Sequence, residues 1–168
     1  MITGSLVSSI QGEPRATHDI DIVINITRAD IPAFIKAFIP PDYYLSESAI
    51  EEAIQYKSMF NLLDTTAGDK VDFWILTDAP FDQSRFARKY EENMLGVVMK
   101  ISAPEDTILM KLKWAKLSGG SEKQFTDALR VYEVQCAKLD HDYMEEWSQI
   151  LNIKELWERV KEEAQPIE

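Results

Sequence analysis

Alternating apolar and polar positions predict several short β-strands in the first hundred residues. In DIDIVINI, residues 19–26, isoleucine occupies every second position, and two aspartates share the opposite face. Residues 58–66 and 70–77 flank a turn at residues 67–69, which predicts a β-hairpin. Residues 96–102, GVVMKIS, predict one more strand. We therefore expect a β-sheet in this part of the chain.

Three short helices are predicted around these strands. Asp30 can cap the second helix, which Pro40 and Pro41 end. Ser48 and Glu51 have capping-box spacing at the start of the third helix. Only a three-residue strand stub precedes the first helix. The three helices cover residues 4–12, 31–38 and 48–56.

From Pro104 onward the composition changes to helix formers. Pro104 suits a first helical turn, and the helix over residues 104–117 ends at Gly119 and Gly120. Residues 121–139 and 142–165 predict two or three more helices. We expect an α/β (α+β) protein with a mixed β-sheet flanked by helices. Residues 1–103 would form its core, and residues 104–168 a helical C-terminal region packed on that core.

Charge and composition exclude some classes of function. The 168 residues carry 18 basic and 29 acidic side chains, a net charge of -11 that repels polyanions held over a broad surface, so broad duplex DNA binding is not expected. The one cysteine, Cys136, excludes an internal disulfide and is interpreted as a helix core residue. No membrane-spanning run or signal peptide is evident, and we expect a cytoplasmic location.

Asp19 and Asp21 are the first candidate site residues. Residues i and i+2 of a strand point the same way with Cα atoms about 6.6 Å apart, so their carboxylates can converge on one cation. Oxygen ligands favour Mg²⁺ or Mn²⁺. The alternative is a solvated strand end. Asp72 repeats the pattern within KVDFWIL, and three carboxylates on adjacent strands could hold two metals, as in phosphoryl or nucleotidyl transfer.

Gly4 and Ser5 stand where the first helix is predicted to begin. Glycine permits a close backbone approach, and the free N–H groups of a helix N-terminus attract phosphate. The same pair is also common in turns and caps. Its position one short helix ahead of the acidic pair favours the phosphate interpretation.

Together these segments resemble the DNA polymerase beta-like nucleotidyltransferase superfamily. The run TGSLVSSIQGEPRATHDIDIVI has a Gly-Ser helix start followed by an acidic pair on a strand. With KVDFWIL and ISAPEDTILMKLKWA it is similar to the small bacterial, toxin-type (abortive-infection-like) nucleotidyltransferases. The resemblance covers residues 3–26, 70–77 and 101–132.

This resemblance implies a nucleotidyltransferase fold and magnesium-dependent (or manganese-dependent) transfer of a nucleoside monophosphate from a nucleoside triphosphate to a hydroxyl. By implication Gly4 and Ser5 contact the triphosphate, and Asp19, Asp21 and Asp72 are catalytic metal ligands. The family has a helix and a strand before the Gly-Ser element. Here we expect either a start further upstream or a shortened form whose strand stub holds the phosphate loop poorly.

Three further residues have two interpretations each. Arg15 can meet a phosphate, or it can be exposed or paired with a carboxylate. Lys111 matches a lysine common in the toxin-type relatives and can neutralise phosphate, or it can lie on a solvated face with its stem packed. Asp127 falls where those relatives have Lys-Asp, but Lys123 is displaced from that pattern, which leaves the role of Asp127 open.

Several other residues are assigned to structure. His18 adjoins the acidic pair, but strand alternation turns it to the opposite face, so we interpret it as a packing or surface residue. His141 lies in a polar link between helices and has no partner at ligand spacing. The helical tryptophans are interpreted as core or interface residues rather than as base-stacking platforms. They are Trp114, Trp147 and Trp157.

Two classes of function therefore remain. The first is a metal-dependent nucleotidyltransferase acting on an RNA, protein or small-molecule acceptor. The second is a non-catalytic protein of the same fold that binds a partner protein, for example in a toxin–antitoxin pair. A partner protein or a homo-oligomer stays open for both classes. The three acids favour the enzyme, and the short N-terminal element favours the binding protein.

Overall fold

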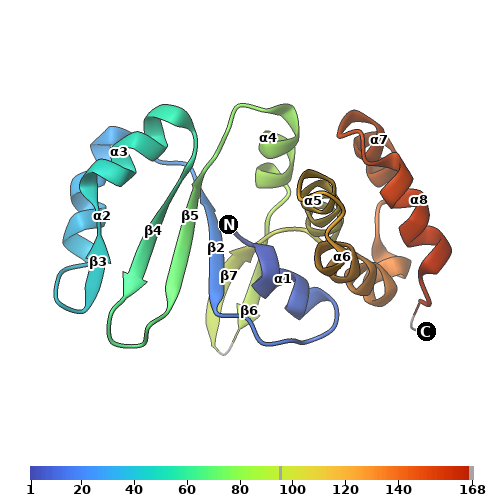
Figure 1. Cartoon of the computed structure of the whole chain (residues 1–168), viewed down its shortest axis with the longest axis horizontal. Coiled ribbons are helices and arrows are strands. Elements are labelled where there is room, and N and C mark those ends of the chain that lie inside the picture. The colour runs from blue at the N-terminus through green and yellow to red at the C-terminus, as the bar shows by residue number, and fades with distance from the viewer. Residues whose placement is uncertain (95, 167–168) are drawn as a thin grey trace.

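The computed structural model describes residues 1–94 and 96–166, which form a mixed seven-stranded sheet with helices packed against it (Figure 1). The strand order is β3-β4-β5-β2-β1-β7-β6. The strands are β1 (Ile2–Thr3), β2 (Asp19–Ile24), β3 (Tyr43–Leu45), β4 (Met59–Asp64), β5 (Lys70–Ile75), β6 (Tyr90–Met94) and β7 (Val97–Ile101).

Eight α-helices and two 3₁₀ turns complete the described chain. The helices are α1 (Gly4–Gln11), α2 (Ile31–Ala37), α3 (Glu47–Tyr56), α4 (Pro80–Ala87), α5 (Pro104–Leu117), α6 (Glu122–Gln135), α7 (His141–Ile150) and α8 (Lys154–Glu163). The 3₁₀ turns are η1 (Arg28–Asp30) and η2 (Cys136–Lys138). The expected α/β class with a mixed sheet and a helical C-terminal region is confirmed.

The two-stranded centre of the sheet sets the position of the site. Strands β2 and β5 run parallel, with Asp21 in register with Asp72. The β-hairpin formed by β4 and β5 is antiparallel, as its sequence predicts. The short β1 is held on both sides, since Ile2 pairs with Ile22 of β2 and with Ile101 of β7.

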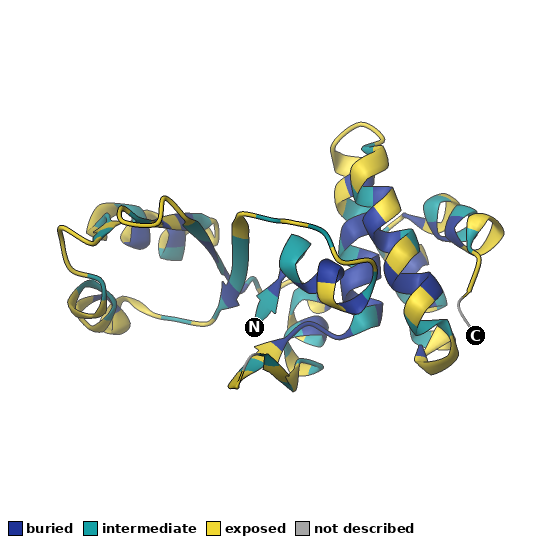
Figure 2. Ribbon diagram, turned by 90° about the horizontal axis from the view of Figure 1, so that it is seen from below, coloured by how far each residue is buried: buried dark blue, intermediate teal, exposed yellow. Residues whose placement is uncertain are grey.

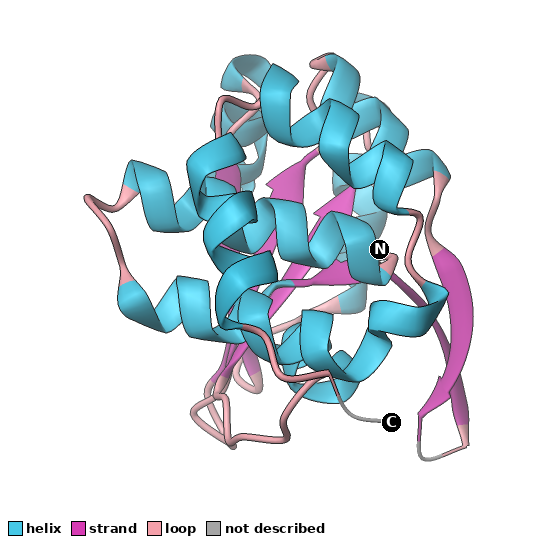
Figure 3. Ribbon diagram, turned by 90° about the vertical axis from the view of Figure 1, so that its right-hand side faces the viewer, coloured by secondary structure: helices cyan, strands magenta, loops and turns pink. Residues whose placement is uncertain are grey.

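Two hydrophobic cores lie on either side of this centre. Strands β4 and β5 contribute Phe60, Phe73 and Ile75 to a cluster beneath α2 and α3. The second cluster joins α5, α6, α7 and α8 around the fully buried Trp157. Figure 2 shows the buried positions along these helices, and Figure 3 shows the helices in front of the strands. The division at residue 103 stays a prediction.

Besides the two 3₁₀ turns, two strands and one α-helix of the described chain were not expected from the sequence: β3, β6 and α4. Strand β3 has three residues, too few to display a period, and the YEENM of β6 has no apolar alternation. Strand β6 is held by its antiparallel pairing with β7. Helix α4 begins at Pro80, a residue suited to a first helical turn.

One capping prediction was wrong, and the other was right only in position, since Asp30 precedes α2 as its N-cap residue. Ser46, not Ser48, caps α3, and its hydroxyl accepts a hydrogen bond from the Ala49 N–H at 3.3 Å. Asp30 does not cap α2 through its side chain. Its carboxylate accepts from the N–H and hydroxyl of Thr27, which closes the 3₁₀ turn instead. In both cases a partner nearby in the chain offers the better geometry.

No helix within residues 1–94 and 96–166 has the length and apolar composition needed to cross a membrane.

Candidate functional site

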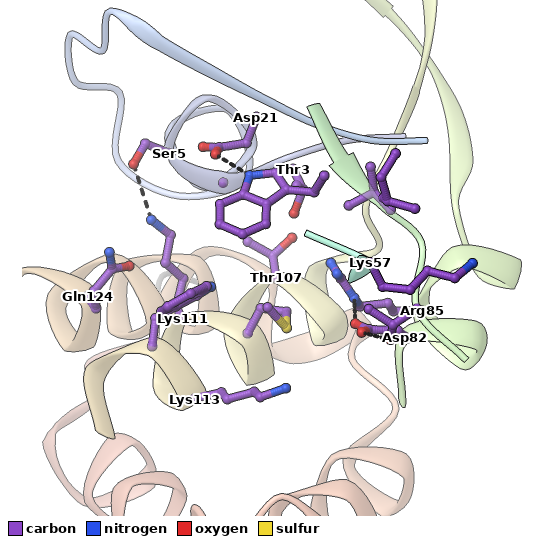
Figure 4. Close-up of a pocket in the computed structure, with 17 residues that line it drawn as sticks. Thr3, Ser5, Asp21, Lys57, Asp82, Arg85, Thr107, Lys111, Lys113 and Gln124 are labelled. Carbon is purple, nitrogen blue, oxygen red and sulfur yellow. Dashed lines mark hydrogen bonds and ion pairs between the residues drawn. The ribbon is translucent and has the colours of Figure 1, made fainter. Parts of the chain in front are cut away.

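A cavity of about 540 Å³ lies between the centre of the sheet and α5, with residues of α1 and α4 at its sides (Figure 4). Four of the candidate residues line it: Gly4, Ser5, Asp21 and Lys111. Asp19, Asp72 and Arg15 are not among its lining residues. The volume falls within the range of small-molecule sites.

Gly4 determines how closely α1 approaches β2. Its φ is +69°, and a Cβ at this position would lie 2.1 Å from Oδ2 of Asp21. Only glycine avoids that overlap and adopts the left-handed backbone without strain. The N-terminus of α1 therefore begins directly against the Asp21 carboxylate.

Asp21 and Asp72 lie on the same face of the sheet. On β5, Phe73 and Ile75 face the core beneath α2 and α3, so alternation turns Asp72 and Trp74 to the opposite face. The register of the parallel strands then sets Asp72 beside Asp21.

The two acids have different partners. The indole N–H of Trp74 donates to Oδ1 of Asp21 at 3.1 Å. Burial raises the pKa of Asp21 above its usual range, the Trp74 hydrogen bond opposes this, and the charge of Asp72 adds to it. Asp72 is buried and accepts hydrogen bonds from the Asn61 amide and from Lys70, whose ammonium nitrogen lies 2.9 Å from its Oδ2.

Asp19 stands apart from this pair. Its side chain is 64% exposed and lies 3.8 Å from the same Lys70 ammonium group. Within the described residues, no three Asp, Glu, His or Cys side chains are arranged to hold a metal ion. The cation beside Asp72 in this structure is the Lys70 ammonium group. Metal binding by the three acids stays a prediction.

A network of charged groups lies beneath the start of α1. Lys111 of α5 is 4% exposed and donates to Oδ2 of Asp127 at 2.7 Å and to the Ser5 hydroxyl at 3.3 Å. Arg15 also donates to both, at 2.7 Å to Oδ2 of Asp127 and at 3.0 Å to Ser5. Two cations therefore meet at the Ser5 hydroxyl, and the one carboxylate that they share, Asp127, leaves one positive charge in excess.

The protonation of this network follows from burial and pairing. Burial lowers the pKa of Lys111, and its hydrogen bond to Asp127 partly offsets this. Burial alone would raise the pKa of Asp127, but hydrogen bonds from Arg15 and Lys111 hold it below the usual range. Of the interpretations open for Arg15, the structure shows pairing with a carboxylate. Lys111 is buried and does not lie on a solvated face. Asp127 is the carboxylate with which both cations pair.

The cavity is electropositive in a protein of net charge -11. Its lining includes four cations, Lys57, Arg85, Lys111 and Lys113, and two acids, Asp21 and Asp82. Arg85 is paired with Asp82 at 2.7 Å. Over the part of the chain that the structure describes, Lys57 and Lys113 have no ion pair at all. This excess of positive charge is suited to an anionic ligand.

Of the two structural interpretations of Trp114, core or interface, the core does not hold. This side chain is 40% exposed and lines the cavity together with Trp74. Trp157 lies in the helical core, and the half-buried Trp147 packs against it. Cys136 also packs against this core but is only half-buried, in the 3₁₀ turn η2 rather than inside a helix. His18 is exposed, and His141 contacts the Cys136 carbonyl oxygen and the ring of Tyr132.

Helical spacing could have indicated the cavity face of α5. Its four residues at positions i, i+3, i+4 and i+7 all line the cavity: Thr107, Met110, Lys111 and Trp114. The remaining faces bury Ile108, Leu109, Leu112 and Ala115 in the helical core. Trp74, Arg85 and Gln124 carry no such signal, because their positions depend on how the elements pack.

Comparison with known proteins gives a likeness to a solved structure. No family model matches the chain, and no curated protein matches it. The chain is similar to the crystal structure of an antigenic nucleotidyltransferase-like protein from Paracoccidioides brasiliensis, with a TM-score of 0.47 and 16% identity over 98% of this chain and 84% of that chain. That likeness is too low to assign a family, so the chemistry of the site rests on its own residues.

Proposed function

We propose that this protein is a nucleotidyltransferase that binds a nucleoside triphosphate in the cavity. It would transfer the nucleoside monophosphate to a hydroxyl of an RNA, protein or small-molecule acceptor. One observation carries the proposal: the N-terminus of α1, an excess of cations and the Asp21 carboxylate line the same cavity of a strongly acidic protein. The motif resemblance of residues 3–26 and 70–77 agrees with it.

The triphosphate would bind at Ser5. The hydroxyl of Ser5, the N–H groups at the start of α1 and the cations Arg15 and Lys111 can all donate to phosphate oxygens. Asp127 holds the two cations in place while neutralising only one of their charges. In phosphoryl-type transfer the protein contributes mainly positioning and charge stabilisation, which suits this set of residues.

Mg²⁺ or Mn²⁺ would be held by Asp21 and Asp72, with Asp19 as a third ligand. The donors fit a hard cation, since they are all carboxylate oxygens and Asp21 and Asp72 share one face of the sheet. A bound divalent cation would neutralise charge on the transferring phosphate. The cation would replace the Lys70 ammonium group beside Asp72, and Asp72 would then help to activate the acceptor hydroxyl.

The alternative proposal is a non-catalytic protein that acts by binding a partner, for example in a toxin–antitoxin pair. It is favoured by Lys70, which already neutralises Asp72, and by the exposure of Asp19 away from the cavity. In that case the cavity would show no metal-dependent binding of a nucleotide.

Thermal unfolding separates the two proposals. We would measure the Tm of the wild type with each of ATP, GTP, CTP and UTP, with and without Mg²⁺ or Mn²⁺. A ligand that binds only the folded state at about 100 times its Kd should raise the Tm by about 5–10 °C for a chain of this size.

Asp21→Asn should lose the metal-dependent shift, because it removes a carboxylate that we propose binds the metal. Asp69→Asn is the matched control, since Asp69 is an exposed aspartate in the turn between β4 and β5. It should keep the shift. No shift with any combination, in a folded wild type, would contradict the enzyme and support the binding protein.

A further inference from the structure

Two tryptophans from different elements meet in the cavity. Trp74 of β5 and Trp114 of α5 have ring centroids 6.0 Å apart and planes inclined at 57°, within the range of interacting aromatic pairs. Both line the cavity. Trp114 nevertheless remains 40% exposed. A large aromatic side chain that stays half open beside a cavity offers a face to a ligand.

Trp74 is held in a fixed orientation. Its indole N–H donates to Oδ1 of Asp21 at 3.1 Å, as the dashed line beside Asp21 marks in Figure 4. Trp114 is set by the cavity face of α5, one helical turn beyond Met110 and on the same face as Lys111. The aromatic pair therefore adjoins both Asp21 and the cation that contacts Ser5.

The cavity consequently has two chemically different parts. The part around Ser5 and Lys111 provides a hydroxyl, a helix N-terminus and positive charge, which suit phosphate. The part formed by Trp74 and Trp114 provides aromatic faces, which suit a flat ring system. A nucleotide carries both groups, joined by a sugar.

Gln124 of α6 adds a polar group to the same cavity. Within the described residues its side-chain amide oxygen is buried and has no hydrogen-bond partner. In Figure 4 it lies on the same side of the cavity as Lys111. A donor on the sugar or base of a bound ligand would satisfy this oxygen, which otherwise loses hydration without compensation.

From this arrangement we infer that Trp74 and Trp114 form a subsite that stacks the base of the bound nucleotide, while Ser5, Arg15 and Lys111 hold its phosphates. The inference rests on the proposed function, since it names where the base of that same substrate binds. It makes Trp114 a determinant of nucleotide affinity and leaves the affinity for phosphate alone unchanged.

Isothermal titration calorimetry with two kinds of probe tests this subsite. The probes are ATP, GTP, CTP and UTP, each with Mg²⁺, and inorganic tripolyphosphate, which has no base. Stacking on one aromatic residue contributes roughly five- to a hundredfold in affinity, so Trp114→Leu should raise the Kd of the bound nucleotide by at least about fivefold. The Kd of tripolyphosphate should stay the same.

Two further variants make the result specific. Trp114→Phe keeps an aromatic face and should recover most of the nucleotide affinity. Tyr44→Leu removes an aromatic residue from β3 that is 60% exposed and lies outside the cavity lining, and it should change neither Kd. Urea unfolding of each variant shows that it is folded, which we expect because Trp114 is partly exposed.

The outcomes distinguish the subsite from the function on which it rests. If Trp114→Leu leaves the nucleotide Kd unchanged, or weakens tripolyphosphate as much as nucleotide, the base subsite is wrong and the proposed function stands. If the wild type binds tripolyphosphate and nucleotides equally, the base makes no contact and the subsite is again wrong. If the wild type binds no nucleotide, the proposed function fails and the subsite fails with it.

Discussion

At the scale of single residues, Gly4 decides whether a helix can begin against a carboxylate. The positive φ and the contact with Asp21 are two separate demands on this position. Gly68, in the turn between β4 and β5, meets only the first demand. Its φ is +77°, and nothing lies within 4 Å of the position where its Cβ would be.

Variants of Gly4 and Gly68 allow the cost of the positive φ and the cost of the close contact with Asp21 to be measured separately. Gly68→Ala should lower the free energy of unfolding by roughly 1–3 kcal/mol, because alanine is strained in the left-handed region. Gly4→Ala should cost that amount and more, since its Cβ must also displace the Asp21 carboxylate or the start of α1. Urea unfolding checks both variants. Equal losses would contradict the close approach of α1 to Asp21.

At the scale of elements, Asp127 joins three parts of the chain. The loop before β2 contributes Arg15, α5 contributes Lys111, and α6 contributes Asp127 itself. Lys111 and Asp127 are both buried, so each depends on the other for its charge to be compensated. The network fixes the start of α1 against the helical region at the point where we propose phosphate binding.

Removing the carboxylate should leave Lys111 buried without a full partner. We expect Asp127→Asn to lower the free energy of unfolding by about 3 kcal/mol, as broken buried ion pairs do. The double variant Lys111→Met/Asp127→Leu should regain part of this loss, since it removes both buried charges and leaves only Arg15, which is partly exposed to solvent. Glu122→Gln, at an exposed ion pair with Arg159, is the control and should change stability little.

The stabilities of the wild type and of Asp127→Asn should also respond differently to pH. The pKa of Asp127 is lower in the folded chain than its ordinary value of 3.8. Its stabilisation is therefore complete above that value and is lost as the pH falls through the folded pKa. The difference in unfolding free energy between wild type and Asp127→Asn should shrink in that acidic range. A difference that stays constant there would contradict the ionised network.

At the scale of the whole molecule, α1 connects the sheet to the helical region. The Gln11 amide donates to the carbonyl oxygen of Ser102 at 2.7 Å, and the Gln135 amide of α6 donates to the carbonyl oxygen of Gln11 at 2.9 Å. At Gly12 a Cβ would lie 2.8 Å from the backbone nitrogen of Val131. The end of α1 therefore packs directly on the backbone of α6.

These contacts predict that residues 1–103 do not fold alone. Without α5 and α6, α1 loses the surface on which it packs, and the cavity loses a wall. We expect the full chain to unfold in one transition and a fragment of residues 1–103 to show no cooperative urea transition by circular dichroism. Adding a fragment of residues 104–168 should restore it. A cooperative transition of the first fragment alone would show that the core is an independent domain.

Much of the fold follows from local patterns in the sequence. The alternation at residues 19–26 predicts β2 and the shared face of Asp19 and Asp21, and the turn at residues 67–69 predicts the β-hairpin of β4 and β5. Strands β3 and β6 escape prediction because backbone pairing with β4 and β7 holds them rather than any period of their own. The caps at Ser46 and Asp30 depend on small differences in local geometry.

The sequence by itself determined which residues carry the chemistry along each strand and helix: a glycine before a helix, carboxylates on two strands, and a lysine on a long helix. Only the tertiary structure decided which of them meet. It paired Asp21 with Asp72, placed Lys70 rather than a third acid beside Asp72, and brought Arg15 and Lys111 together at Ser5 and at Asp127. The physical reason is that periodicity acts over a few residues, whereas these contacts depend on strand order and helix packing between segments up to 112 residues apart.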